Sequence, residues 1–302
     1  MAWQKLGRIF DPADYTLPWL RSHAALPVVM PLAEDSVRIY FSGRDSQNRA
    51  HIGCFHFDLR THTVQYLAPE PLVRPGEIGM FDDSGVTTSC IVQYGGRHYL
   101  YYSGWALGVT VPFYFFIGAA HSSDGGATFE KVSPAPIMGW HTLDPYLLGS
   151  PFILVEDTRW RMWYVSGVKW EQTDTELRHY YLIKYAESRD GLQWERNGHI
   201  CIPFASADEY AIARPFVLKE HGLYKMWYAY RGAAYRIGYA ESPDGLHWTR
   251  KDGEVGIDVS PQGWDAEMVE YPYIYDHDKR RYMFYNGNGY GKSGIGLAVW
   301  HE

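Results

Sequence analysis

The chain has 302 residues, of which 46% are hydrophobic and 17% aromatic, and its 28 basic and 35 acidic residues give a formal net charge of −7. This acidic balance, without any basic run, argues against a nucleic-acid partner, because phosphate backbones are bound through clustered Lys and Arg. Three widely spaced cysteines without a C-x-x-C pair indicate neither a disulfide framework nor a zinc site.

The start of the chain and its longest apolar run predict the compartment. Residues 1–15 lack the basic-then-apolar pattern of a secretory signal. The longest apolar run, 109–120, is interrupted by Pro112 and is too short to cross a bilayer. We therefore expect a cytoplasmic protein with no membrane partner.

A unit recurs along the chain: an apolar strand, a charged turn, an aromatic strand that ends in Gly, and further strands. The closing glycines are Gly43, Gly104, Gly167, Gly232 and Gly287. A second landmark lies 15 to 17 residues upstream of each glycine, and its positions are Pro27, Thr88, Pro151, Pro215 and Pro272. Self-similarity at this period predicts an array of supersecondary units.

Each unit is expected to form four short strands. In the fourth unit these are 214–220, 224–230, 235–242 and 247–252. The last two strands are joined by the turn S-x-D-G-x-x-W, which also occurs at 188–194 and in a related form at 122–129. Asp-Gly supplies the left-handed backbone that a tight hairpin requires, so we interpret this motif as structural.

Four-stranded units repeated around an axis form a β-propeller. The sequence therefore predicts an all-β fold, a five-bladed β-propeller with four-stranded blades, in a single domain over residues 1–302. A β-sandwich gives no reason for the repeat. Six blades require a further unit that the chain lacks.

The ring needs a closing strand. The fifth unit ends after its third strand, 294–302, whereas residues 3–9 resemble the fourth-strand segment 194–200. We expect the N-terminal strand to complete the last blade and so to remove an exposed sheet edge.

In a propeller, the segments leading into the inner strands and the segments joining the second and third strands open on one face around the axis, so the site is expected in these two sets of segments. The segments leading into the inner strands are acidic, and the catalytic candidates are Glu270, Asp83, Asp144 and Glu209. The alternative role for such acids is turn chemistry, which we favour for Asp208 and Asp265 and weigh equally for Asp144. Glu270 differs, because a carboxylate inside an inner strand is seldom buried without a partner or a task.

Basic, aromatic and small polar residues of the same segments are candidates for substrate binding. An arginine beside carboxylates either balances their charge or binds an anionic substrate group. Aromatic faces suit stacking on sugar rings, and a histidine suits proton transfer. The substrate-binding candidates are His23, Arg44, Asp82, Trp105, Ser150, Trp170, Arg214, Arg231, Tyr271, Asn286 and Lys292, with Tyr235 and Tyr290 as further stacking faces.

Through its hairpin motifs and its inner strands ending in Pro, the chain resembles the five-bladed β-propeller glycosidases, which include glycoside hydrolase families 43, 32, 68, 117 and 130. The resemblance implies acids just before the inner-strand prolines. Here Leu26, Ser150 and Arg214 stand immediately before three of those prolines. Only Glu270-Tyr271-Pro272 is similar to the Glu-Gly-Pro acid motif of those families. The usual triad is therefore not in place.

The resemblance implies a carbohydrate-active, glycoside hydrolase-like enzyme that acts on a small-molecule or oligosaccharide substrate. In that interpretation Glu270, in apolar surroundings, is the acid, and Asp83, in a polar run, is the base. The alternatives are a phosphate-using glycoside phosphorylase and a non-hydrolytic sugar-binding or tailoring protein. A further comparison is with sialidases, in which three arginines grip a carboxylate as Arg44, Arg214 and Arg231 would. No cofactor is expected; an axial metal ion and the oligomeric state are left open.

Overall fold

The computed structural model describes residues 2–301, and in this range the regular elements are twenty β-strands and two 3-10 helices of three residues each. The first group of strands is β2 (Ser22–Pro31), β3 (Ser36–Arg44), β4 (Ala50–Asp58) and β5 (Thr63–Leu67). The second is β6 (Gly85–Tyr94), β7 (Arg97–Leu107), β8 (Phe113–Ser122) and β9 (Glu130–Lys131). The third is β10 (Leu148–Glu156), β11 (Arg159–Gln172), β12 (Leu177–Ser188) and β13 (Glu195–Ile202).

The remaining elements complete the chain. The fourth group is β14 (Ala211–Glu220), β15 (Leu223–Arg231), β16 (Tyr235–Ser242) and β17 (Thr249–Arg250). The last group is β18 (Glu270–His277), β19 (Arg280–Asn286), β20 (Ile295–His301) and the N-terminal β1 (Ala2–Phe10). The 3-10 helices are η1 (Pro12–Asp14) and η2 (Asp252–Glu254). None of the described helices is long and apolar enough to cross a membrane.

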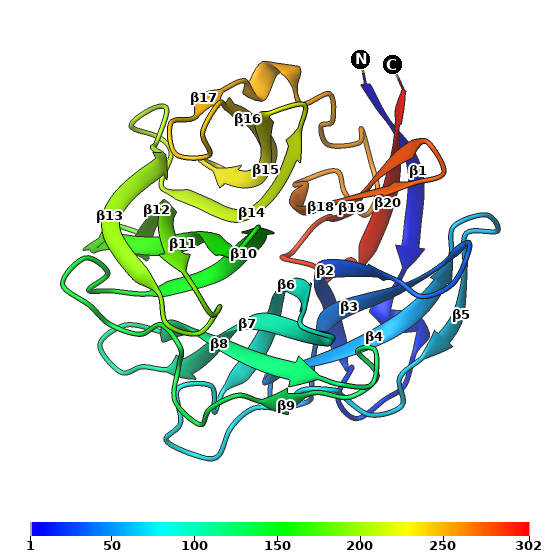
Figure 1. Cartoon of the computed structure of the whole chain (residues 1–302), viewed down its shortest axis with the longest axis horizontal. Helices are drawn as coiled ribbons and strands as arrows, with labels where there is room; N and C mark the ends of the chain where they lie inside the picture. The colour runs from blue at the N-terminus through cyan, green and yellow to red at the C-terminus, as the bar shows by residue number, and fades with distance from the viewer. Residues whose placement is uncertain (1, 302) are drawn as a thin grey trace.

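The strands of each group pair antiparallel in order, and the groups stand around a common centre (Figure 1). Single parallel bridges, Ala50 with Gly85 and Tyr181 with Ala211, join neighbouring groups into two eight-stranded sheets beside one four-stranded sheet. The first strands touch in sequence, β2 with β6, β6 with β10, β10 with β14, β14 with β18, and β18 again with β2. This is the architecture of a β-propeller.

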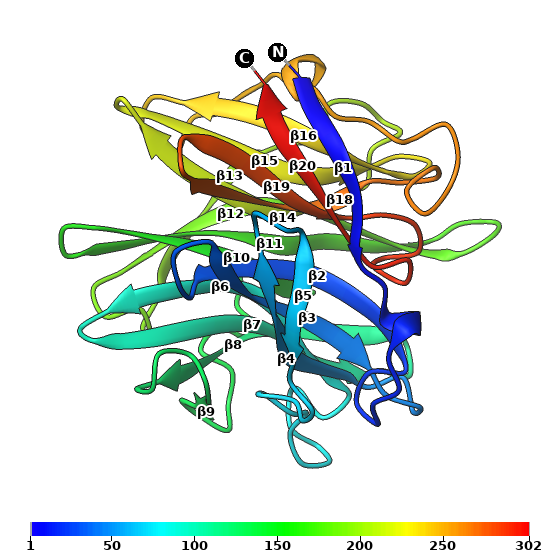
Figure 2. The ribbon, with the colours of Figure 1, turned by 90° about the vertical axis from the view of Figure 1, so that its right-hand side faces the viewer.

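The two ends of the chain meet in one sheet, as the sequence predicts. β1 pairs antiparallel with β20, from Ala2 opposite His301 to Phe10 opposite Ile295 (Figure 2). The indole rings of Trp3 and Trp300 pack edge to face with centroids 5.0 Å apart. The pairing gives β20 a neighbour on both sides and places β1 at the outer edge of the sheet.

The S-x-D-G-x-x-W motifs form the hairpin turns that the sequence predicts. In one of them, Asp190 Oδ1 accepts hydrogen bonds from the backbone N–H groups of Leu192 and Gln193, both at 2.8 Å. Gly191 takes a φ of 75°, which glycine adopts without strain. Its carbonyl accepts a 2.9 Å hydrogen bond from Tyr101 Oη of the preceding group. The turn thus stabilises its own hairpin and also the contact with the neighbouring strand group.

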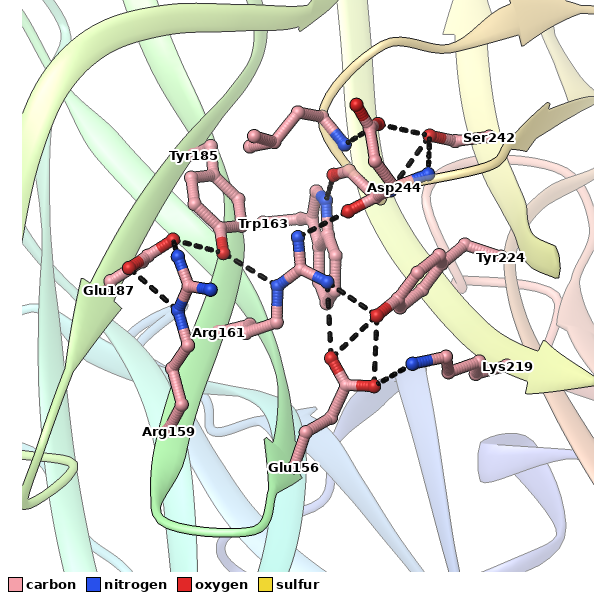
Figure 3. Close-up of polar contacts among 12 residues, drawn as sticks. Glu156, Arg159, Arg161, Trp163, Tyr185, Glu187, Lys219, Tyr224, Ser242 and Asp244 are labelled. Carbon is pink, nitrogen blue, oxygen red and sulfur yellow. Dashed lines mark hydrogen bonds and ion pairs between the residues drawn. The ribbon is translucent and has the colours of Figure 1, made fainter. Parts of the chain in front are cut away.

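Arg161 of β11 holds the third and fourth groups together in the same way (Figure 3). It donates hydrogen bonds to Tyr185 Oη at 2.6 Å, to Tyr224 Oη at 2.5 Å and to the carbonyl of Asp244 at 2.6 Å. It also pairs with Glu156 at 3.1 Å. The buried guanidinium therefore has partners for its charge and its donors, and it rigidifies the contact between the groups.

Four inner strands carry the same distortion near the axis. The residue before each landmark proline has a left-handed backbone, and the pairing register shifts there, as expected for a bulge. These residues are Leu26 (φ 59°), Ser150 (φ 43°), Arg214 (φ 54°) and Tyr271 (φ 56°). Each bulge redirects side chains at the centre of the molecule, where conformational strain in non-glycine residues often accompanies function.

Candidate functional site

Three of the acids that lead into the inner strands, Asp82, Asp144 and Asp265, are buried in polar networks inside the strand groups. Asp144 is fully buried and accepts hydrogen bonds from Tyr164 Oη at 3.1 Å and Ser166 Oγ at 2.6 Å. It also forms ion pairs with Lys184 at 3.3 Å and Arg196 at 3.0 Å. With four partners, this carboxylate anchors the incoming loop to its strands, which favours the structural role over the catalytic one.

The same arrangement recurs in two other groups. Each buried aspartate accepts from a tyrosine of the second strand and pairs with a lysine of the outermost strand. The sets are Asp82 with Tyr102 (3.2 Å) and Lys131 (2.6 Å), and Asp265 with Tyr285 (3.0 Å) and Lys5 (2.7 Å). Asp82, predicted to bind substrate, is therefore placed in a structural ion pair away from the axis.

Glu209 and Asp83 are also engaged in local structure. Glu209 pairs with both terminal nitrogens of Arg250, at 2.7 and 2.9 Å, and accepts from the backbone N–H of Ala205 at 2.8 Å. Asp83 accepts from the backbone N–H of Gly79 at 2.9 Å and from Ser84 Oγ at 2.7 Å. Neither carboxylate lines the axial cavity. The structure does not bring Asp83 opposite Glu270 across a shared site.

An axial cavity of about 170 Å³ lies where the inner strands converge. Its aromatic wall is formed by Phe113, Phe115, Tyr181, Tyr235, Tyr271 and Tyr290. Small hydroxyl side chains also face it: Ser42, Thr87, Ser103 and Ser150. Its basic or titratable nitrogen groups are His23, Arg44 and His179. No described Asp or Glu lines this cavity.

Some of the residues expected at the axis line this cavity, together with residues that the sequence did not single out. His23, Arg44, Ser150 and Tyr271 line it, as do both further stacking tyrosines. His179 was missed, although it lies in one of the segments expected to open on the axis. Its ring stacks on Tyr181 with centroids 5.1 Å apart. The available signal was its place in an otherwise aromatic run at 179–181.

Glu270 lies beside this cavity but is covered. It opens β18 opposite Asn286, and neither of its carboxyl oxygens reaches solvent or has a hydrogen-bond partner among the described residues. Burial raises its pKa well above the usual range, against the opposing influence of Tyr271 and Arg231. Burial therefore favours the protonated form of this carboxyl, as expected for a carboxyl in apolar surroundings.

Two tyrosines of the wall contact each other directly. The hydroxyl groups of Tyr181 and Tyr235 form a hydrogen bond, and the rings of Tyr235 and Tyr271 lie 5.9 Å apart. The guanidinium of Arg231 lies 5.6 Å from the ring centroids of both Tyr235 and Tyr290. Arg231 thus borders the wall through cation–π contacts without lining the cavity itself.

Both cavity histidines are held neutral. Burial, followed by the charges of Arg44 and Lys292, lowers the pKa of His23 to about 4. Burial, followed by the charge of Arg231, lowers the pKa of His179 to about 4. At neutral pH the two rings can therefore take part in hydrogen bonds and stacking but carry no charge.

Arg214 and Asn286 have structural positions rather than the predicted substrate contacts. Arg214 is only 1% exposed and donates to the carbonyls of Pro27 (2.9 Å), Thr88 and Ser89, tying β14 to β2 and β6. Burial lowers its pKa to about 10. Because its donors point away from the cavity, the sialidase-like trio is not assembled. Asn286 is fully buried and donates to the carbonyl of Ala24 at 2.7 Å.

Three further candidates lie around the cavity rather than in its lining. Trp170 packs against Phe113 and His179, with centroids 5.4 and 5.0 Å away. Trp105 packs against Phe115 at 6.3 Å. Lys292 is exposed. The two indoles therefore support the aromatic wall from behind. Within residues 2–301, no cluster of three or more His, Cys, Asp or Glu side chains is arranged to hold a metal ion.

Comparison with known proteins places the chain in a family. No protein-family model matches it. It is 47% identical over 300 residues to "Uncharacterized protein Rv1502" of Mycobacterium tuberculosis (strain ATCC 25618 / H37Rv), and the match covers 99% of both chains. The chain belongs to the Rv1502 family.

Several solved structures whose titles name glycoside hydrolases are similar in fold to this Rv1502 family member. One described as a glycoside hydrolase has a TM-score of 0.75 at 18% identity, and the match covers 99% of this protein and 91% of the other. A thermostable family-43 glycoside hydrolase has a TM-score of 0.70 at 16% identity, with coverage of 95% and 93%. A structure from a study of the GH130 family of mannoside phosphorylases has a TM-score of 0.69 at 14% identity, with coverage of 100% and 90%. These likenesses show that the chain shares the fold of these proteins, and a shared fold does not by itself transfer their activity.

Proposed function

We propose that this protein binds one sugar unit of a glycoside or of a glycosylated small molecule in the axial cavity. The observation that carries the proposal is the lining of that cavity, in which aromatic faces alternate with hydroxyl groups at the centre of a glycosidase-like fold. Aromatic faces with a few well-placed polar groups are what a sugar ring requires, since its C–H faces stack and its hydroxyls form hydrogen bonds.

We further propose that this binding proceeds without ordinary glycoside hydrolysis. Hydrolysis uses two carboxyl groups, about 5–5.5 Å apart for retention and about 6.5–9.5 Å apart for inversion. No described carboxylate lines the cavity, and Glu270 is covered. The arrangement therefore favours a sugar-binding or tailoring protein on a glycosidase-like scaffold. We also propose that each four-stranded group is one blade, giving five blades in a single domain, and we keep cytoplasmic location as a prediction.

Glycoside phosphorolysis is the second candidate, and the raised pKa of Glu270 favours it. In that reaction one carboxyl group protonates the departing glycosidic oxygen, and inorganic phosphate attacks the anomeric carbon to form a sugar phosphate, so a second carboxylate is unnecessary. The raised pKa of Glu270 favours the protonated form that this role requires. The reaction additionally requires a rearrangement that exposes Glu270 to the cavity.

A panel of aryl glycosides, assayed with and without inorganic phosphate and followed by titration calorimetry with free sugars, separates these functions. Binding heat without turnover is the expected result. Turnover that requires phosphate supports phosphorolysis and overturns the non-catalytic proposal, whereas turnover in water restores the hydrolase. Absence of both heat and turnover for every sugar overturns sugar binding.

A further inference from the structure

Arg44, at the wall of the cavity, lacks the carboxylate partner that several other cations of this protein have. Arg250 pairs with Glu209 at 2.7 Å, and Lys184 pairs with Asp144 at 3.3 Å. Arg44, by contrast, donates one side-chain hydrogen bond, to the neutral Asn48 Oδ1 at 2.9 Å. No carboxylate within residues 2–301 lies at ion-pair distance from it.

Leaving this guanidinium unpaired is costly, because Arg44 lies at the wall of a largely apolar cavity. Burial lowers its pKa, which reports the loss of hydration of the charged form. A partly desolvated charge is normally compensated by an opposite charge. Since the protein supplies none in the cavity, a ligand is the remaining source.

A second cation reinforces the positive potential at the same side of the cavity. Lys292 belongs to the loop after β19, and the adjacent Gly291 carbonyl accepts a 2.9 Å hydrogen bond from the backbone N–H of Ala24. This contact fixes the lysine loop against the segment that holds His23. The charges of Arg44 and Lys292 both act on His23. The site is therefore electropositive, although the chain as a whole has a net charge of −7.

We propose that the ligand of the axial cavity carries an anionic group, a carboxylate or a phosphate, and that Arg44 binds this group while Lys292 attracts it from the rim. The inference rests on the proposed function, because it assigns the charge of the sugar that the cavity takes. A guanidinium matches either group, since its fork of N–H donors binds two oxygens of one anion. The neutral His23 adds a hydrogen-bonding group without adding charge.

The test compares matched ligands on matched variants by titration calorimetry. Glucuronate and galacturonate present a carboxylate, glucose 1-phosphate and mannose 1-phosphate present a phosphate, and glucose, galactose and mannose are neutral. The proteins are the wild type, Arg44→Gln, Arg44→Lys and the control Arg60→Gln, which removes an exposed arginine outside the cavity. A melting curve of each variant verifies folding.

We expect at least one charged sugar to bind about tenfold or more tightly than its neutral counterpart. Arg44→Gln should abolish that preference, Arg44→Lys should retain part of it, and Arg60→Gln should leave it intact. Whichever set binds more tightly, the uronates or the sugar phosphates, identifies the anionic group as a carboxylate or a phosphate. Equal affinity for neutral and charged sugars, or an unchanged preference in Arg44→Gln, overturns the inference while the sugar-binding proposal stands.

Two further outcomes separate the inference from the function on which it rests. If no sugar of either kind binds, the proposed function fails, and inorganic phosphate and acetate then test the anion site alone. Binding of either ion that Arg44→Gln removes supports the anion site, and its absence overturns it. If Arg44→Gln fails to fold, Arg44→Lys and the salt dependence of wild-type binding decide the question, because an ionic contact weakens as salt rises.

Discussion

Two fully buried carboxyl groups, Asp144 inside the third strand group and Glu270 at the axis, have opposite surroundings. Asp144 has two hydroxyl donors and two cations around it. Glu270 has no hydrogen-bond partner within the described chain, and its pKa is raised by burial. The comparison shows that burial alone does not mark a functional acid. A satisfied carboxylate stabilises the fold, whereas an unsatisfied one, here beside the axial cavity, costs stability.

The largest expected effect is that of replacing Asp144, the buried carboxylate with four partners. Asp144→Ala should destabilise the protein by about 3–5 kcal/mol, because it leaves Lys184 and Arg196 as buried charges without their partner. Urea denaturation of the variant and the wild type measures the loss. Asp83→Asn serves as the control, since Asp83 is half-buried and forms turn contacts only. A loss below about 1 kcal/mol for Asp144→Ala would contradict the structural role.

The second prediction concerns Glu270, the carboxyl group without a hydrogen-bond partner, and the direction in which its effect on stability changes with pH. The folded pKa of Glu270 is raised, so its contribution to stability is present below the unfolded pKa near 4.5 and is lost as pH rises toward the folded pKa. Glu270→Gln should remove that loss, so that the difference in unfolding free energy between variant and wild type grows by up to about 1.4 kcal/mol per pH unit above that point. Urea denaturation at pH 5, 6.5 and 8 measures the difference. A difference that is independent of pH would show that Glu270 is ionised in the fold.

The third prediction concerns the cavity histidine His179, for which stability falls as pH drops rather than as pH rises. The folded pKa of His179 is lowered to about 4, so protonation favours the unfolded chain, and stability should fall as pH drops from about 6.5 toward 4. His179→Gln should reduce this acid sensitivity by about 1 kcal/mol, a value discounted because the ring is partly exposed. Thermal melts from pH 7 to pH 4 compare it with His221→Gln, a change outside the cavity. If the melting temperatures of the wild type and both variants change with pH in the same way, His179 is not the source of the acid sensitivity.

The smallest expected effect is at the edge of the cavity. Trp170→Ala should weaken sugar binding by about 1 kcal/mol, about fivefold in Kd, because Trp170 supports Phe113 and His179 from behind. Calorimetry with the best ligand of the charged and neutral panel measures the change. Trp140→Ala provides the control, since that indole is exposed and does not line the cavity. Loss of melting temperature in Trp170→Ala with unchanged affinity would make Trp170 a packing residue only.

Much of the fold was predictable because its signals are local. The turn Ser188-x-Asp190-Gly191 forms its hydrogen bonds within a few residues, so the motif itself specifies the hairpin. The likeness of 3–9 to 194–200 likewise indicated an outer strand at the chain start, and β1 occupies that place beside β20. Strand-forming residues at a fixed period leave few architectures open.

The site was predictable only in part, because its acids are distinguished by partners that lie far away in the chain. Asp82 and Asp83 are adjacent in sequence, yet only Asp82 meets Lys131, which is 49 residues further along. Arg214 reaches the carbonyl of Pro27 across 187 residues. No pattern around either residue encodes such a contact.

Local sequence is sufficient to specify the repeat, the hairpins and the strand that joins the two ends, since each depends on a short run of residues and its period. Which side chains face the axis depends on how the strands pack together. At the bulges before the landmark prolines, a left-handed residue changes the direction of its neighbours, so Ser150 and Tyr271 reach the cavity while Arg214 turns toward backbone carbonyls. Side-chain direction at a bulge depends on the packing of several strands, and therefore becomes fixed only when the ring of strands is assembled.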